Sequence, residues 1–304
     1  MIMENGLRGP DFFIVGAPKC GTTAMYRYLR QHSDVFMPAR KELHFFGTDL
    51  SSPVYVRDKR EYLACFSKAR GEKRLGEASV WYLYSRRAAR EIKEFCPSAC
   101  IIIMLRNPVD MLYAQHSQFL YNGNEDIEDF EAALDAEEDR KRGLRIPRSA
   151  HLVEGLFYRE TAKYVQQVQR YLDVFEREDV HFIIFDDLQN NASATYRKTL
   201  RFLRVDEDFQ PDFDVVNPNK RLRSWALHSF LWRPPEIVVR LGRALMPRSQ
   251  RGWLVDAIKR LNTQHKPRPP MDPELRRHLK LEFAPEVERL SELLGRDLTH
   301  WSEG

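Results

Sequence analysis

The chain has 304 residues, of which 43% are hydrophobic and 30% charged, and its net charge is +4. This composition is ordinary for a globular enzyme, the small net charge argues against a nucleic-acid partner, and the length suits one large α/β domain or two small ones. No apolar run reaches transmembrane length, and the first ten residues carry no apolar signal core. The four cysteines form no CxxC pair, so we expect no zinc site, reduced thiols and a cytoplasmic location.

The first predicted element is a buried strand, because Phe12–Val15 is a short apolar run with β-branched residues. A loop from Gly16 to Gly21 interrupts it, and a helix over Thr22–Gln31 follows. A strand, a glycine loop and a helix N-terminus form an anion cradle, because unpaired N–H groups and the helix dipole face one point. The two glycines have Walker A spacing, but Lys19 lies inside the loop instead of after the second glycine. The loop therefore predicts a nucleotide site without the usual metal geometry.

Strands and helices alternate along the rest of the chain. The predicted strands are Leu75–Ser79, Cys100–Leu105 and Val180–Phe185, and the predicted helices are Tyr55–Phe66, Arg86–Phe95, Pro108–Tyr121, Phe130–Arg142, Tyr158–Phe175, Thr195–Leu203 and a last region that begins at Asp272. Such alternation is typical of a parallel sheet covered on both faces. We therefore predict an α/β protein with a P-loop-like three-layer fold, in which helices flank a central parallel β-sheet, and a single domain over residues 1–304.

Charge is unevenly distributed. Nine acidic residues and no basic residue lie between Glu125 and Asp139, whereas residues 220–277 hold fourteen Lys or Arg against four Asp or Glu. The basic segment includes two predicted amphipathic helices, Pro235–Leu245 and Ser249–Leu261. We expect residues 217–270 to form a basic helical lid over the predicted nucleotide site and an acceptor cleft. A solvated face and a peripheral membrane contact are the alternatives.

Several blocks resemble the sulfotransferases that use 3'-phosphoadenosine 5'-phosphosulfate (PAPS). They are Gly16–Thr23, Lys41–Phe46, Ile101–Ser117, Phe202–Asp206 and Pro270–Trp301. The resemblance covers nearly the whole chain and is to the bacterial and glycan-modifying branch, which includes the heparan sulfate sulfotransferases. It implies the sulfotransferase fold and direct in-line transfer of a sulfuryl group from PAPS to an acceptor hydroxyl. The product nucleotide would be 3'-phosphoadenosine 5'-phosphate (PAP), with no metal required.

The first loop would hold the 5'-phosphosulfate. The resemblance assigns the 5'-phosphate to four consecutive residues: Cys20, Gly21, Thr22 and Thr23. It places Lys19 over the bridging oxygen. A cation is needed there because cleavage of the S–O bond leaves charge on the departing phosphate.

The 3'-phosphate site is assigned in the same way. Arg106 matches the family arginine on this phosphate, and guanidinium forks onto phosphate. The serine that the family usually carries eight residues later is alanine here, so Ser117, one helical turn further on, is the predicted substitute, with His116 as another candidate. Lys266 and Arg268 fall where the heparan-type enzymes carry a basic loop over the cofactor, although a rigid basic linker fits equally well.

Glu42 is the predicted catalytic base. In the glycan-type enzymes a glutamate of the Lys/Asn-Glu-x-His-Phe-Phe block takes the acceptor proton, as general base catalysis requires. His44 is the rival, since cytosolic sulfotransferases use histidine. We favour Glu42 because a lone histidine beside two phenylalanines is more often structural, and we expect the two side chains to point apart. Lys41 is expected to orient the acceptor or the base.

Residues 77–79 match a family segment that lines the acceptor site. Glu77, Ser79 and Tyr82 are therefore predicted to contact the acceptor, which is a glycan, lipid or small metabolite. Two alternative functions stay open. One is a P-loop kinase or NTPase, because Phe182–Asp186 has the apolar-then-Asp pattern of a Walker B strand. The other is a non-catalytic anion- or membrane-binding protein.

Overall fold

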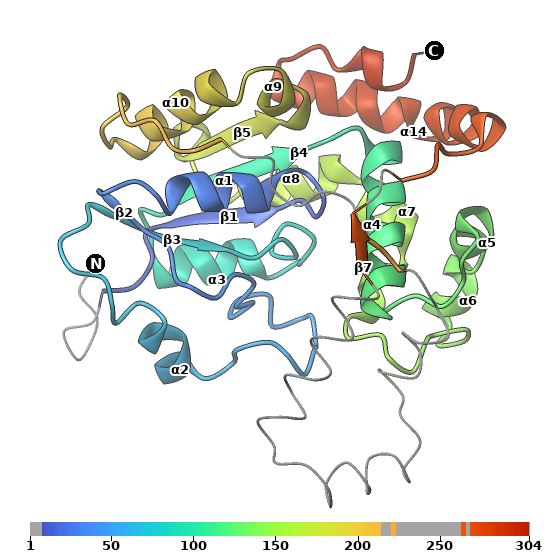
Figure 1. Ribbon diagram of the computed structural model, residues 1–304, viewed down its shortest axis with the longest axis horizontal. Helices are drawn as coiled ribbons and strands as arrows, with labels where there is room; N and C mark the ends of the chain where they lie inside the picture. Colours follow the sequence, from blue (N-terminus) through green and yellow to red (C-terminus); the bar gives the residue numbers. More distant parts are fainter. Residues whose placement is uncertain (1–7, 214–219, 223–262, 266–267, 304) are drawn as a thin grey trace, which may run out of the picture.

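A computed structural model describes residues 8–213, 220–222, 263–265 and 268–303. Its centre is a five-stranded sheet with the strand order β2-β3-β1-β4-β5, and every neighbouring pair is parallel. The strands are β1 (Phe12–Gly16), β2 (Val35–Phe36), β3 (Arg74–Ala78), β4 (Cys100–Leu105) and β5 (Val180–Ile184). Helices flank the sheet (Figure 1), which confirms the predicted α/β class and three-layer fold.

The two central strands are apolar throughout. All five residues of β1 are buried, and so are the last five of β4. Both faces of these strands are covered, which explains why they read as continuous apolar runs in the sequence. The edge strand β2 was not predicted, because two residues carry no periodicity.

The helices are generally shorter than predicted. They are α1 (Thr22–Leu29), α2 (Lys59–Ala64), α3 (Ala88–Phe95), α4 (Pro108–Asn122), α5 (Phe130–Asp135), α6 (Glu137–Lys141), α7 (Tyr158–Thr161), α8 (Tyr164–Leu172), α9 (Phe185–Asn190), α10 (Ala192–Leu203) and α14 (Pro273–Leu294), with 3-10 turns η1 (Val153–Leu156), η2 (Arg177–Asp179) and η3 (Thr299–Trp301). Side-chain caps fix several starts. The Asn107 side chain accepts from Val109 N before α4, and the Asp272 side chain accepts from Leu275 N before α14.

Three predicted helices are wrong in extent: Tyr55–Phe66, Phe130–Arg142 and Tyr158–Phe175. The first begins only after Asp58, whose side chain caps α2. The second divides into α5 and α6 at Ala136. The third divides into α7 and α8, and the Gln167 amide donates to the carbonyls of Glu160 and Thr161 at 3.2 and 3.1 Å. That side chain thereby adds hydrogen bonds to the carbonyl groups at the end of α7.

A second, antiparallel ladder pairs β6 (Lys220–Leu222) with β7 (Thr263–His265), and it lies beside α4 (Figure 1). The predicted helices Pro235–Leu245 and Ser249–Leu261, and most of the predicted lid, lie outside the described residues. No helix in the described part of the chain is long and apolar enough to cross a membrane. The cytoplasmic location and the single-domain organisation stay predictions.

Candidate functional site

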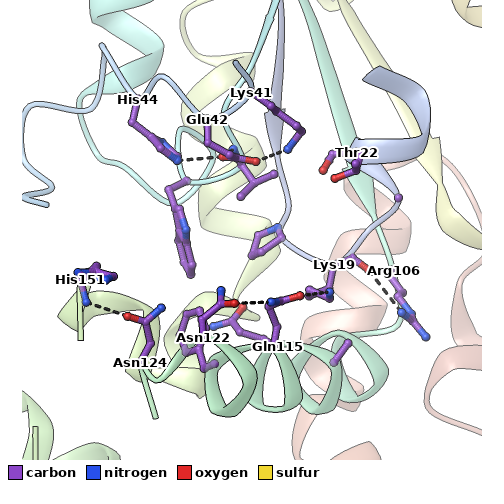
Figure 2. Close-up of a pocket in the computed structure, with 18 of the residues that line it drawn as sticks. Lys19, Thr22, Lys41, Glu42, His44, Arg106, Gln115, Asn122, Asn124 and His151 are labelled. Atoms are coloured by element: carbon purple, nitrogen blue, oxygen red, sulfur yellow. Dashed lines mark hydrogen bonds and ion pairs between the residues drawn. The ribbon is translucent and has the colours of Figure 1, made fainter. Parts of the chain in front are cut away.

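A cavity of about 600 Å³ opens at the carboxyl ends of β1, β3 and β4. Open α/β sheets bind ligands at this edge, and the volume suits a small-molecule site. Much of its lining comes from the loop after β1 and the start of α1, from residues 41–44, from the residues that follow β3, and from one side of α4 (Figure 2). Residues from several of the sequence blocks that resemble sulfotransferases therefore line one cavity.

The loop after β1 has a backbone that only particular residues adopt easily. Gly21 has φ +85°, and a Cβ atom there would lie 2.8 Å from Leu188 Cδ2, so glycine is required. Helix α1 starts at the next residue, and its first turn contains no acidic residue. Gly21, Thr22 and Thr23 line the cavity. The positive end of α1 is thus open to an anion.

Cys20 is predicted to contact the 5'-phosphate through its backbone, and its side chain packs away from the cavity. Its side chain is fully buried, and its Sγ lies 3.3 Å from Pro18 O and 3.9 Å from Tyr164 Oη. Burial raises the pKa of this thiol to about 12. The side chain does not line the cavity, so it is not available to a ligand there.

Basic side chains meet at the same end of the cavity. Lys19 Nζ donates to Gln118 Oε1 of α4 at 3.3 Å. Arg106, which follows β4, donates to the Lys19 carbonyl at 3.4 Å, and its guanidinium lies 4.6 Å from the centroid of the Phe185 ring. Both basic residues line the cavity (Figure 2), so this end attracts negative charge.

A third basic residue, Arg268, lines the cavity with them. Its guanidinium lies 4.9 Å from the centroid of the Tyr113 ring, and within the described residues its buried Nε has no hydrogen-bond partner. Burial and the neighbouring Arg106 lower the pKa of Arg268. Ala114 lines the cavity but Ser117 does not, and Lys266 lies outside the described residues. The structure therefore brings Arg268, and not Ser117, to the cavity.

Glu42 lies at the centre of a compact polar cluster. Its Oε1 contacts Lys41 Nζ, and its Oε2 lies 2.9 Å from His44 Nε2 and accepts from Val80 N at 3.0 Å. Burial raises the pKa of Glu42, but the Lys41 ammonium and the His44 contact outweigh it and lower the pKa to about 2. The carboxylate is therefore ionised at every pH at which the enzyme would work.

The expectation that Glu42 and His44 point apart is wrong. Residues two apart share a face even in an extended segment, and here both residues have positive φ, +63° and +51°. Three of the five described non-glycine residues with positive φ line the cavity, the third being Lys19. Each such conformation costs about 1–3 kcal/mol, and such strain gathers at functional sites.

The three predicted acceptor residues do not line the cavity. Glu77, Ser79 and Tyr82 are buried beneath it. Ser79 Oγ accepts from His44 N at 3.0 Å and donates to Glu77 Oε1, and Tyr82 Oη accepts from Phe46 N at 3.3 Å. Their geometry supports the segment that carries Glu42 and gives no contact with an acceptor.

Other residues line the cavity that the sequence reasoning did not assign to a site. Four of them lie on α4 at helical spacing: Gln115, Gln118, Phe119 and Asn122. Their position after Arg106 is a signal that the sequence does contain. Tyr55, Asn124 and His151 come from loops, and no sequence pattern marks them.

A family model described as the sulfotransferase domain matches residues 9–213. The chain belongs to the sulfotransferase family. The solved structure of a sulfotransferase from Alicyclobacillus acidocaldarius is 31% identical and covers 98% of this chain and 100% of its own, with a TM-score of 0.74. These matches confirm the predicted family and the sulfotransferase fold.

Two curated human relatives act on carbohydrates by name. Carbohydrate sulfotransferase 15 is 25% identical over 64% of this chain and 44% of its own length. Heparan sulfate glucosamine 3-O-sulfotransferase 6 is 31% identical over 37% of this chain and 31% of its own. The chain spans less than half the length of these curated relatives.

In the kinase hypothesis the aspartate after β5 would bind a metal ion, but Asp186 and its neighbour Asp187 contact the C-terminal part of the chain. Asp186 Oδ2 accepts from Trp301 Nε1 at 2.7 Å, and Asp187 forms an ion pair with Arg296 at the C-terminal end of the fold. Neither aspartate lines the cavity. Among the described residues no group of three or more His, Cys, Asp or Glu is placed to hold a metal ion. The comparisons likewise match sulfotransferases and give the kinase or NTPase alternative no support.

Proposed function

We propose that this sulfotransferase transfers a sulfuryl group from PAPS to a hydroxyl of a carbohydrate acceptor. The observation that carries the proposal is one cavity with basic side chains and the start of α1 at one end, and the Glu42 carboxylate on another wall (Figure 2). Such a cavity offers a site for an anionic donor next to a proton acceptor.

The residues present fit the donor. Lys19, Arg106 and Arg268 supply positive charge, and the buried Nε of Arg268, which has no partner among the described residues, offers a further donor. The first turn of α1 and the hydroxyls of Thr22 and Thr23 would hold the 5'-phosphate. Arg106 and Arg268 would hold the 3'-phosphate. When bound, PAPS supplies an S–O bond whose cleavage leaves negative charge on the 5'-phosphate.

Lys19 is suited to stabilise that charge. Its Nζ is held at 3.3 Å by Gln118 Oε1, and the Gln118 amide in turn donates to Asn122 Oδ1 at 2.8 Å. A preorganised ammonium is effective because it needs no reorganisation during the reaction.

Glu42 is the proposed base, and His44 positions it. The His44 ring is almost fully buried and packs against Tyr55 at a tilt of 34° with ring centroids 4.4 Å apart, and its backbone N–H donates to Ser79 Oγ. From this fixed position Nε2 orients Glu42 Oε2. This arrangement gives both residues a role and makes the carboxylate the proton acceptor.

The acceptor would lie among aromatic rings and amides. Trp81 and Phe119 have ring centroids 6.3 Å apart, and Asn122 and Asn124 line the cavity beside them. An apolar ring next to amide groups suits the mixed surface of a sugar, and the names of the curated relatives support the same acceptor class.

The test is transfer of label from ³⁵S-PAPS to a panel of oligosaccharides, lipid alcohols and phenols. We expect label on the oligosaccharides and a loss of at least about 100-fold in Glu42→Gln. Glu131→Gln is the matched control, since Glu131 is an exposed carboxylate of α5, and it should retain full activity. Transfer to no acceptor, or undiminished transfer by Glu42→Gln, would contradict the proposal.

A further inference from the structure

The carboxylate of the predicted base, Glu42, already contacts three hydrogen-bond donors in this structure. Glu42 Oε1 contacts Lys41 Nζ, while Oε2 receives His44 Nε2 and Val80 N. A carboxylate offers about four lone-pair sites, so three donors leave little room for the proton of an acceptor. The pKa near 2 has the same cause, because an adjacent ammonium stabilises the ionised form.

Of these three donors, only Lys41 is free to move. Val80 donates from its backbone, and His44 is fixed by Ser79 and by the Tyr55 ring. Lys41 instead carries its ammonium on a flexible four-carbon stem, and it lines the cavity together with Thr22. In the view of Figure 2 its amino group lies between the Glu42 carboxylate and Thr22, at the start of α1.

Lys41 therefore contacts one anion, the Glu42 carboxylate, and lines the same cavity as the start of α1, which suits a second anion, the phosphosulfate. We infer that Lys41 is a second catalytic cation, which leaves Glu42 for the sulfuryl oxygens when the donor binds and so frees Glu42 Oε1. This inference rests on the proposed function. In the step that follows, the acceptor oxygen bonds to sulfur and its proton passes to Glu42 Oε1. The bond from sulfur to the bridging oxygen breaks, and its electron pair stays on the 5'-phosphate.

The movement of Lys41 makes Glu42 an effective base only when PAPS is bound. Besides Lys41, the titratable groups around Glu42 are His44, Tyr55 and the buried Glu77. Those three belong to the fixed wall of the cavity or lie beneath it. Departure of the Lys41 ammonium removes the main attraction that lowers the pKa of Glu42, so the proton affinity of the carboxylate rises as the acceptor arrives.

The test follows the Glu42 carboxyl carbon by NMR in protein labelled with ¹³C-glutamate, with the signal assigned by its loss in Glu42→Gln. Titrations between pH 4 and pH 8 compare free protein with protein saturated with PAPS. In free wild type the signal should stay constant. With PAPS it should titrate with a midpoint above pH 4, a rise of at least about 100-fold in proton affinity from the pKa of about 2 in the free protein.

Lys41→Met separates the movement of Lys41 from the negative charge that PAPS itself brings. In this variant Glu42 should titrate at higher pH even without PAPS, and PAPS should shift its midpoint less than in wild type. Lys198→Met, which removes an exposed lysine of α10, should behave as wild type. A shift in wild type no larger than that in Lys41→Met would overturn the inference.

Calorimetry with PAPS distinguishes the two levels of failure. Binding without the change at Glu42 would overturn the inference and leave the proposed function intact. A wild-type protein that does not bind PAPS would overturn the proposed function and this inference with it.

Discussion

Glu77 should make the stability of the protein depend on pH near neutrality. The residue is 1% exposed, its Oε1 accepts from Ser79 Oγ, and its Oε2 accepts from Tyr62 Oη at 3.4 Å. Burial raises the pKa of Glu77 from 4.5 to about 7, and hydrogen bonds from Ser79 and the nearby tyrosines offset only part of that rise. In the unfolded chain the pKa returns to its ordinary value.

The sign follows from where the proton is bound. Below pH 4.5 both states hold the proton, and between pH 4.5 and pH 7 only the folded state holds it. The contribution is therefore fully present below pH 4.5 and is lost as the pH rises through 7. A rise in pKa from 4.5 to about 7 corresponds to about 3 kcal/mol, most of which is lost between pH 5 and pH 8.

The assay is urea denaturation of wild type and Glu77→Gln at pH 5 and pH 8. Glutamine keeps the shape of the side chain but does not ionise. The free energy of unfolding of the variant, relative to wild type, should rise by about 2–3 kcal/mol between the two pH values. The exposed control Glu131→Gln should show no such change. Parallel pH profiles of wild type and Glu77→Gln would refute the reasoning.

Three further predictions concern the donor end of the cavity. Lys19→Met should slow sulfuryl transfer by about 10²–10³ while calorimetry shows a much smaller loss of PAP affinity; equal losses would contradict a role at the bridging oxygen. Ala114→Ser should tighten PAP binding several-fold, since Ala114 lines the cavity; unchanged affinity would mean that Arg268 already completes the site. Gly21→Ala should lower the free energy of unfolding by about 1 kcal/mol or more, because φ is +85°; wild-type stability in urea would argue against this loop geometry.

The parts of the fold that the sequence predicts well are those with local causes. The strands β1 and β4 are continuous apolar runs, and the Asp272 side chain caps α14 where expected. The broken helices have tertiary causes, such as the Gln167 amide that serves the end of α7. Sequence periodicity does not report such contacts.

In the candidate site, too, the residues that the sequence predicts are those with local signals. The loop from Lys19 to Thr23 and the position of Arg106 follow from strand, glycine and helix signals, and the structure brings them to one cavity. The spacing of Glu42 and His44 already lets their side chains share a face, whereas the positive φ of both residues is a backbone conformation that their residue types do not predict. The burial of Glu77 likewise depends on which side of the chain the cavity lies, and a motif match does not contain that information.

Titration calorimetry with PAP and with ATP, each with and without magnesium, tests the central claim most directly. PAP resembles the proposed donor except for the sulfuryl group, and the basic side chains Lys19, Arg106 and Arg268 line its proposed site. Tight binding of PAP that needs no magnesium and exceeds the binding of ATP is the predicted result. Preference for magnesium-ATP, or no binding of PAP, would contradict the account.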